Sequence, residues 1–260
     1  MGLLTILSMV GCGFLGNTES TPEAASEGAD EEVEEVQEVQ DAAAQAVEQV
    51  AATATEGNTG GEDADAEDGA QSALMNPAGA TQTAPAEFTI VWTTTEGEFE
   101  MACSREWAPN GADRLYNLVQ VGYYTDIAVF RIIDGFMAQF GMHGDPTING
   151  AWKDARIQDD PGVKSNTRGY VSFATSGPNT RTTQLFINFG DNSRLDASGF
   201  TPVCIVDEDG MAVVDKLHSG YGEGAPRGRG PAQGQIQRVG NTYLKAQFPE
   251  LDYIVSAAVK

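Results

Sequence analysis

The stretch Phe130-Arg-Ile-Ile-Asp-Gly-Phe-Met-Ala-Gln139 places one cation among apolar and aromatic residues. Side chains of a β-strand alternate between the two faces of a sheet, so Arg131 and Ile133 are expected to share one face, opposite Ile132. Gly135 should interrupt this alternation, because an interior glycine often marks a bulge or a close backbone approach. The residues that then turn toward the side of Arg131 are Phe136, Met137 and Gln139.

This pattern predicts a guanidinium at the rim of an apolar pocket, which suits a ligand that has both a ring and a carbonyl group. Two simpler interpretations exist for the single residues. An arginine in a strand is more often a surface ion-pair partner, and the aromatic residues alone would be assigned to a core. The stretch therefore defines a candidate site, and the rest of the chain must decide among these interpretations.

Charge is distributed unevenly around this stretch. The chain has 260 residues and a net charge of -23, and 18 of its 38 acidic residues fall in residues 1–87. An acidic chain without a basic stripe argues against nucleic acid as a partner. Three cysteines are too few for a disulfide framework. Cys103 and Cys204 could pair in an exported domain, and buried free thiols are the alternative.

Residues 1–16 are predicted to be a lipoprotein signal or anchor. The apolar run is too short to span a bilayer, and it lacks the positive charge that normally begins a secretory signal. Small residues before Cys12 resemble a bacterial lipoprotein cleavage box, in which this cysteine becomes the lipidated first residue. The alternative is a weakly hydrophobic N-terminus with a chance cysteine. Lipidation predicts a membrane tether in the cell envelope, lipid-anchored or periplasmic, and the alternative location is the cytoplasm.

Residues 17–87 are predicted to be a disordered acidic linker. They are rich in Ala, Glu, Asp, Gly and Thr and contain no aromatic residue before Phe88. Such a segment buries too little apolar area to offset the entropy lost on ordering. Spaced valines between Val33 and Val50 allow a short amphipathic helix or coiled coil, and we favour a transient helix. The folded domain is therefore expected to span residues 88–260.

The sequence of the folded domain predicts many short strands and few helices, a pattern typical of a closed antiparallel barrel. Helical patterns occur in residues 109–122, 211–217 and 236–247. The predicted strand segments are 88–94, 98–103, 127–139, 169–175, 182–189, 199–206 and 251–259.

Several motifs in this domain closely resemble the cyclophilin family of peptidyl-prolyl isomerases. The resemblance covers roughly Phe88 to Val259, and the chain's ending, Phe248-Pro-Glu-Leu-Asp-Tyr-Ile254, resembles a bacterial branch of that family. It implies a mainly β fold, a closed eight-stranded antiparallel barrel capped by two helices with a substrate groove on its outside. The motifs, in chain order, are Phe130 to Gln139, Gly177-Pro-Asn-Thr180, Gln184-Leu-Phe-Ile187 and Leu195-Asp196.

The resemblance also implies roles for individual residues. Arg131 matches the family's essential arginine and is the expected catalytic residue. Nine further residues are expected to bind the substrate, by forming the walls of a proline pocket, by holding the peptide backbone, or by pairing their main chain with the peptide. These substrate-binding residues are Phe136, Met137, Gln139, Ala174, Thr175, Gln184, Phe186, Leu195 and Phe200.

Three positions depart from the family pattern. Arg194 stands where several eukaryotic members carry a tryptophan that helps hold the inhibitor cyclosporin, so weak cyclosporin binding is expected here. Thr175 replaces a common asparagine, which costs little if the contact there is made by backbone groups. Phe200 falls where many members have a histidine.

The chemistry implied by these residues is rotation about an X-Pro peptide bond. That rotation faces a barrier of ~18–20 kcal/mol, because the nitrogen lone pair is delocalised into the carbonyl group. A guanidinium near the prolyl nitrogen stabilises the twisted state more than either planar state. Arg131 can do so without proton transfer. No nucleophile, metal or cofactor is needed, and His143 and His218 lack the partner spacing of metal ligands.

The expected partners are proline-containing peptides and unfolded or folding proteins, with the chain acting as a monomer that assists folding. A second hypothesis is a proline-peptide binding module with little catalysis. A third, an unrelated barrel that holds a small ligand, is disfavoured because the motifs face a peptide groove rather than a closed interior.

Overall fold

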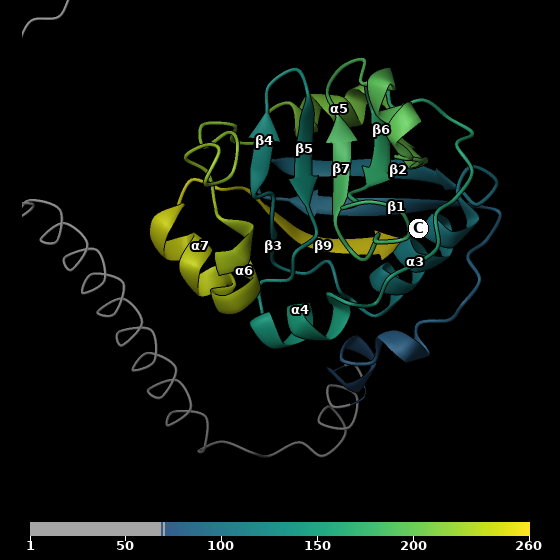
Figure 1. Cartoon of the computed structure of the whole chain (residues 1–260), viewed down its shortest axis with the longest axis horizontal. Helices are drawn as coiled ribbons and strands as arrows, with labels where there is room; N and C mark the ends of the chain where they lie inside the picture. The colour runs from purple at the N-terminus through teal and green to yellow at the C-terminus, as the bar shows by residue number, and fades with distance from the viewer. Residues whose placement is uncertain (1–68, 70) are drawn as a thin grey trace, which may run out of the picture. The chain divides into compact units, whose positions relative to one another are not determined.

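The computed structural model describes residue 69 and residues 71–260 (Figure 1). The anchor predicted for residues 1–16, with its Cys12, lies outside the described residues. So does the linker prediction over residues 17–68 and 70. Within the described part of the chain, no helix is long and apolar enough to cross a membrane.

The folded unit includes chain on the N-terminal side of the boundary predicted at residue 88. The indole Nε1 of Trp152 donates a hydrogen bond to the carbonyl oxygen of Leu74 at 2.7 Å. The backbone of Gln82 and the side chain of Asn117 exchange two hydrogen bonds of 3.0 and 2.7 Å. Residues 74–87 therefore pack against the domain, in contrast to the linker expected there, through polar contacts that composition does not signal.

One antiparallel sheet forms most of the domain. It contains nine strands in the part of the chain that the structure describes, in the spatial order β3-β9-β1-β2-β8-β6-β7-β5-β4. The bounds are β1 Glu87–Thr94, β2 Gly97–Ser104, β3 Ile127–Ala128, β4 Arg131–Ile133, β5 Met137–Phe140, β6 Tyr170–Phe173, β7 Leu185–Asn188, β8 Pro202–Val206 and β9 Tyr253–Val259. The mainly β prediction is confirmed.

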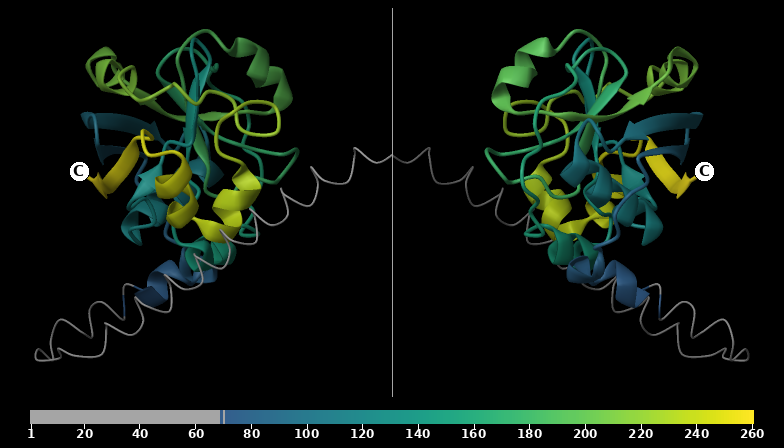
Figure 2. Two further views of the ribbon diagram at one scale, coloured as in Figure 1. Left: turned by 90° about the vertical axis from the view of Figure 1, so that its left-hand side faces the viewer. Right: turned by 90° about the vertical axis from the view of Figure 1, so that its right-hand side faces the viewer.

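The sheet is curled. Its two edge strands, β3 and β4, are consecutive in the chain and are separated only by Val129 and Phe130. In Figures 1 and 2 the half made of β4, β5, β7 and β6 crosses the half made of β1, β2 and β9. No pairing between β3 and β4 occurs in the described ladders. The prediction of a closed, eight-stranded barrel is therefore wrong in strand number and in closure. The predicted segment 127–139 forms three strands, β3, β4 and β5, and the two edges of the sheet lie at the break between β3 and β4.

Helices flank the curled sheet and exceed the two caps that were expected. Their bounds are α3 Pro109–Gln120, α4 Pro146–Trp152, α5 Glu208–Val214, α6 Gln233–Val239 and α7 Asn241–Gln247, with the short 3-10 helices η1 Pro77–Gly79 and η2 Ser193–Ser198.

The helices correct the sequence prediction at two places. The single helix expected over residues 236–247 is divided at Gly240, which has φ +62° and whose Cβ, if present, would collide with the carbonyl of Gly144. Helix α4 was not predicted. Its N-terminus carries the usual signal, because Asp145 accepts a hydrogen bond from the backbone N–H of Thr147 and proline follows at the first helical position.

Cys103 and Cys204 lie opposite each other on β2 and β8 and form a disulfide, which chooses between the two alternatives left open by the sequence. Both side chains belong to the buried core. The rings of Trp92, Tyr124 and Phe140 meet edge-to-face in the same core, with Trp92 centroid distances of 5.0 and 5.4 Å.

A buried ion pair between Arg181 and Asp160 connects the chain before β7 with the start of α3, which Asp160 also contacts. Nη1 of Arg181 lies 3.0 Å from Oδ2 of Asp160, and the two side chains are 2% and 0% exposed. Asp160 also accepts hydrogen bonds from the backbone N–H groups of Asn110 and Gly111, each at 2.8 Å. Asp160 thus satisfies orphan donors at a helix N-terminus as well as a buried cation.

Replacing Asp160 with Ala should lower the free energy of unfolding by about 3–5 kcal/mol, because the buried guanidinium of Arg181 loses its buried carboxylate. The exposed Asp159 then remains near it, at 3.5 Å. Urea denaturation measures the effect. The control is Asp215→Ala, which removes a pair with Arg168 at the surface and should cost about 1 kcal/mol or less. Equal losses in the two variants would contradict the assignment of Asp160 as a buried structural anchor.

Candidate functional site

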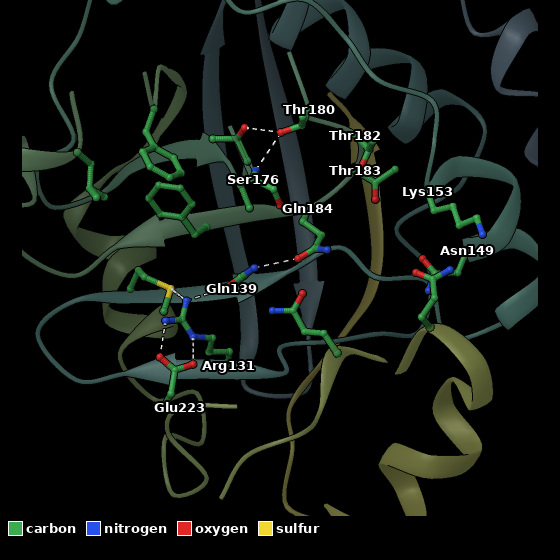
Figure 3. Close-up of a pocket in the computed structure, with 18 of the residues that line it drawn as sticks. Arg131, Gln139, Asn149, Lys153, Ser176, Thr180, Thr182, Thr183, Gln184 and Glu223 are labelled. Atoms are coloured by element: carbon green, nitrogen blue, oxygen red, sulfur yellow. Dashed lines mark hydrogen bonds and ion pairs between the residues drawn. The ribbon is translucent and has the colours of Figure 1, made fainter. Parts of the chain in front are cut away.

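All ten residues that the sequence placed in the site line one cleft of about 510 Å³. Figure 3 shows this cleft with its polar side chains directed into it. The predicted residues found there are Arg131, Phe136, Met137, Gln139, Ala174, Thr175, Gln184, Phe186, Leu195 and Phe200.

The register of three strands puts the central residues on one face. Arg131 on β4 pairs with Gln139 on β5, which in turn pairs with Phe186 on β7. Directly paired residues project from the same face of a sheet. Their chain neighbours, such as Ile132 and Ala138, belong to the core on the opposite face. The cleft consequently lies on the outer face of the curled sheet.

Gly135 sits in the turn between β4 and β5 rather than at a bulge. Its φ is +69°, a conformation that glycine adopts without strain, and the N–H of Phe136 donates to the carbonyl of Ile133 at 2.9 Å. The carbonyl of Phe136 accepts hydrogen bonds from Nδ2 of Asn192 at 2.8 Å and from the N–H of Phe189 at 2.9 Å. These contacts fix the aromatic residue that follows the turn.

The apolar end of the cleft is built from the sheet and from the loop around η2. Met137 and Phe186 are buried, whereas Phe136, Leu195 and Phe200 are half-buried and form its rim. The rings of Phe186 and Phe200 meet edge-to-face at 5.6 Å. The slot is thus lined by aromatic and aliphatic surface while remaining open to a ligand.

Asn166 fixes the η2 loop, and the sequence did not reveal this role. It donates to Oδ1 of Asp196 through its backbone N–H at 2.9 Å and its side chain at 2.7 Å, and also to the carbonyl of Phe200 at 2.7 Å. Burial alone would raise the pKa of Asp196, but hydrogen bonds from Ser165 and Asn166 bring that pKa below its usual value. Nothing in the local pattern connects residue 166 with this loop.

A row of polar contacts forms the other end of the cleft (Figure 3). Nε and Nη2 of Arg131 donate to the two carboxylate oxygens of Glu223 at 2.6 and 2.7 Å. Nη1 donates to Oε1 of Gln139 at 2.9 Å, and Nε2 of Gln139 donates to Oε1 of Gln184 at 2.8 Å. The hydrogen bonds from Arg131 hold the pKa of Glu223 below its usual value.

Glu223, which pairs with Arg131 in the cleft, was not predicted from the sequence. It lies 92 residues after Arg131, in a glycine-rich loop where the sequence indicates only a connection. No spacing rule links the two positions. Other lining residues were not predicted to belong to the site. They come from α4 and the chain after it, from the connection between β6 and β7, and from the chain around α6: Asn149, Lys153, Arg156, Ser176, Thr180, Thr182, Thr183, Arg227, Gln233 and Gln237.

Ala174 and Thr175 border the cleft at the end of β6. The N–H of Ala174 donates to the carbonyl of Gln184 at 2.9 Å. The hydroxyls of Thr175 and Thr180 lie 2.8 Å apart, and the N–H of Ser176 donates to the Thr180 hydroxyl at 2.9 Å. The Thr175 hydroxyl is therefore engaged within its own turn. Among residues 69 and 71–260, no group of three or more His, Cys, Asp or Glu side chains is arranged to hold a metal ion.

Comparison with known proteins agrees with this geometry. The family model described as cyclophilin type peptidyl-prolyl cis-trans isomerase/CLD matches residues 88–241. Peptidyl-prolyl cis-trans isomerase-like 1 of Aspergillus fumigatus is 35% identical over 134 residues, which cover 49% of this chain and 80% of the relative. Peptidyl-prolyl cis-trans isomerase B of Escherichia coli is 30% identical over 135 residues, covering 49% and 82%.

A solved cyclophilin type peptidyl-prolyl cis-trans isomerase of Cryptosporidium parvum has the same fold. The TM-score is 0.50 at 20% identity, over 67% of this chain and 98% of the other. The motifs quoted between Phe130 and Asp196 all lie within the residues that the family model matches. The chain belongs to the cyclophilin-type peptidyl-prolyl cis-trans isomerase family.

Proposed function

We propose that the cleft around Arg131 isomerises X-Pro bonds of peptides and of unfolded or folding proteins. The observation that carries the proposal is that a fixed guanidinium and an aromatic slot line the same open cleft. The ring of a prolyl residue fits the apolar end, and the carbonyl groups beside it fit the polar end. The proposal rests on this chain's own residues as well as on its family.

The slot restrains one side of the rotating bond. A proline ring packed against Met137, Phe186 and Phe200 is held by apolar contact, so the acyl part of the peptide can turn relative to it. Gln139 and Gln184 offer amide groups to the peptide backbone next to that bond. Holding the proline ring while the acyl part turns keeps the rotating bond in the productive geometry beside Arg131, which lowers the entropic cost of reaching the twisted state.

Arg131 acts on the electronic part of the barrier. Twisting the amide localises the lone pair on the prolyl nitrogen and reduces conjugation with the carbonyl. An N–H donor aimed at that region interacts more strongly with the twisted state than with either planar state, which is the condition for catalysis. Preorganised donors of this kind act without reorganisation at the moment of reaction.

Replacing Arg131 with Ala should lower kcat/KM for a prolyl peptide by about 10²–10³-fold, the usual cost of losing one preorganised donor. An exchange-NMR or coupled peptide assay measures this. Arg131→Lys should recover little, because an ammonium group lacks the planar fork. Arg168→Ala, a surface arginine outside the cleft, is the matched control. Full activity in Arg131→Ala would refute the mechanism.

The same assay separates catalysis from simple recognition. A proline-peptide binding module would bind the peptide in an NMR titration without faster cis/trans exchange. Faster exchange at the wild-type cleft would remove that alternative.

Cyclosporin binding should be weak. The guanidinium carbon of Arg194 lies 5.0 Å from the centre of the Phe136 ring, and Nη1 donates to Oδ1 of Asn192 at 3.1 Å. This exposed side chain stands where several family members present an indole. Arg194→Trp should tighten binding, measured by fluorescence or calorimetry. Nanomolar affinity in the unmodified chain would contradict the expectation.

We further propose that the protein belongs to a bacterial branch of the family, acts as a monomer and assists folding in the cell envelope, with a cytoplasmic location as the alternative. The C-terminal motif and the small residues before Cys12 support this proposal. Mass spectrometry of the mature N-terminus should find a lipid-modified Cys12. An unmodified Met1 or Cys12 would remove the anchor.

A further inference from the structure

We propose that Glu223 is a positioning residue for Arg131, so that the loop of residues 219–231 forms part of the isomerase machinery. The inference rests on the proposed function of the cleft and assigns a role to a residue outside the recognised motifs. Glu223 acts through the guanidinium, by fixing its plane and the direction of its remaining N–H groups.

The contacts of Arg131 leave its guanidinium little freedom. Glu223 accepts from Nε and Nη2 on one edge, and Gln139 accepts from Nη1. A two-point arginine–carboxylate pair defines a plane, which a single hydrogen bond does not. Because these acceptors lie on different elements, rotation of the guanidinium would break contacts to both. The N–H groups not used by them remain for the substrate.

The loop folds closely around Glu223. Its carboxylate also accepts from the N–H of Gly224 at 2.9 Å, and its backbone carbonyl accepts from the N–H of Gly230 at 2.9 Å. A Cβ on Gly228 would collide with that carbonyl, and one on Gly230 would lie 3.0 Å from it. Side chains larger than hydrogen at these positions would displace the loop. The glycines therefore serve the close packing that holds Glu223 in place.

The start of the loop is fixed to the C-terminal part of the domain. The N–H of His218 donates to Oδ2 of Asp252 at 2.7 Å. The ring of Tyr221 packs edge-to-face on Phe248 with centroids 5.1 Å apart. Glu223 follows two residues later, so its position is set by these contacts to the C-terminal part of the domain. In Figure 3 its carboxylate faces Arg131 from the side opposite to Gln139.

The expected effect is on turnover rather than on stability. The side chains of Arg131 and Glu223 are 21% and 31% exposed, and an ion pair in contact with solvent contributes little to the stability of the fold. Orientation matters more, because a misplacement of about 1 Å can cost roughly 10²-fold in rate. Peptide affinity depends on the apolar slot, which Glu223 does not form, so KM should change little.

The test replaces Glu223 with Gln in the full chain. The amide keeps one acceptor and turns an NH2 group toward the guanidinium, so kcat should fall about 10-fold or more while KM stays within about 2-fold. Glu223→Asp keeps both acceptor oxygens and should recover part of the rate. The matched control is Asp215→Asn, which breaks a two-point pair with Arg168 of 3.2 and 2.8 Å outside the cleft and should leave kcat unchanged.

A second readout does not depend on activity. The Nε–H proton of Arg131 should exchange slowly with water in the wild type and in Glu223→Asp, and rapidly in Glu223→Gln, as measured by nitrogen-15 NMR. Circular dichroism establishes that each variant is folded. An unchanged or raised kcat in folded Glu223→Gln, or an unprotected Arg131 proton in the wild type, would overturn the positioning role. An inactive wild type would instead overturn the proposed function itself, and the positioning role with it.

Discussion

The pairing register of β4, β5 and β7 is the constraint on which the site depends. Side chains alternate between faces with a period of two, so a slip of one residue would exchange the core face and the cleft face. Arg131 would then point into the core, and Ile132 would point to solvent. The turn at Gly135 sets the register, because it fixes which residue of β5 stands opposite Arg131.

The site divides into a rigid half and a half contributed by loops. The sheet supplies Met137, Gln139 and Phe186, whose positions follow from strand pairing. The η2 loop supplies the rim of the apolar slot and is held by side-chain hydrogen bonds from Asn166. The loop of residues 219–231 supplies the carboxylate that meets the guanidinium. The sheet thus fixes the position of Arg131, and the two loops supply the side chains around it.

The strand segments could largely be predicted from the sequence, and the ten residues predicted for the site come together in one cleft. Alternation revealed the two faces near Arg131. It could not reveal that the sheet stays open between β3 and β4, because the break at Val129 and Phe130 has no turn residue to mark it. Gly240 divides a helix owing to the nearby carbonyl of Gly144, which is a tertiary contact. Glu223 was missed for the same reason, since its partner lies far away in the chain and close only in the folded structure.

The central claim is that a prolyl ring occupies the slot beside Arg131. The direct measurement is a set of intermolecular nuclear Overhauser effects between the wild-type protein and a proline-containing peptide. We expect contacts from the proline ring protons to the Met137 methyl group and the Phe186 ring. Ring contacts confined to other surfaces of the domain, with these side chains unaffected, would contradict it.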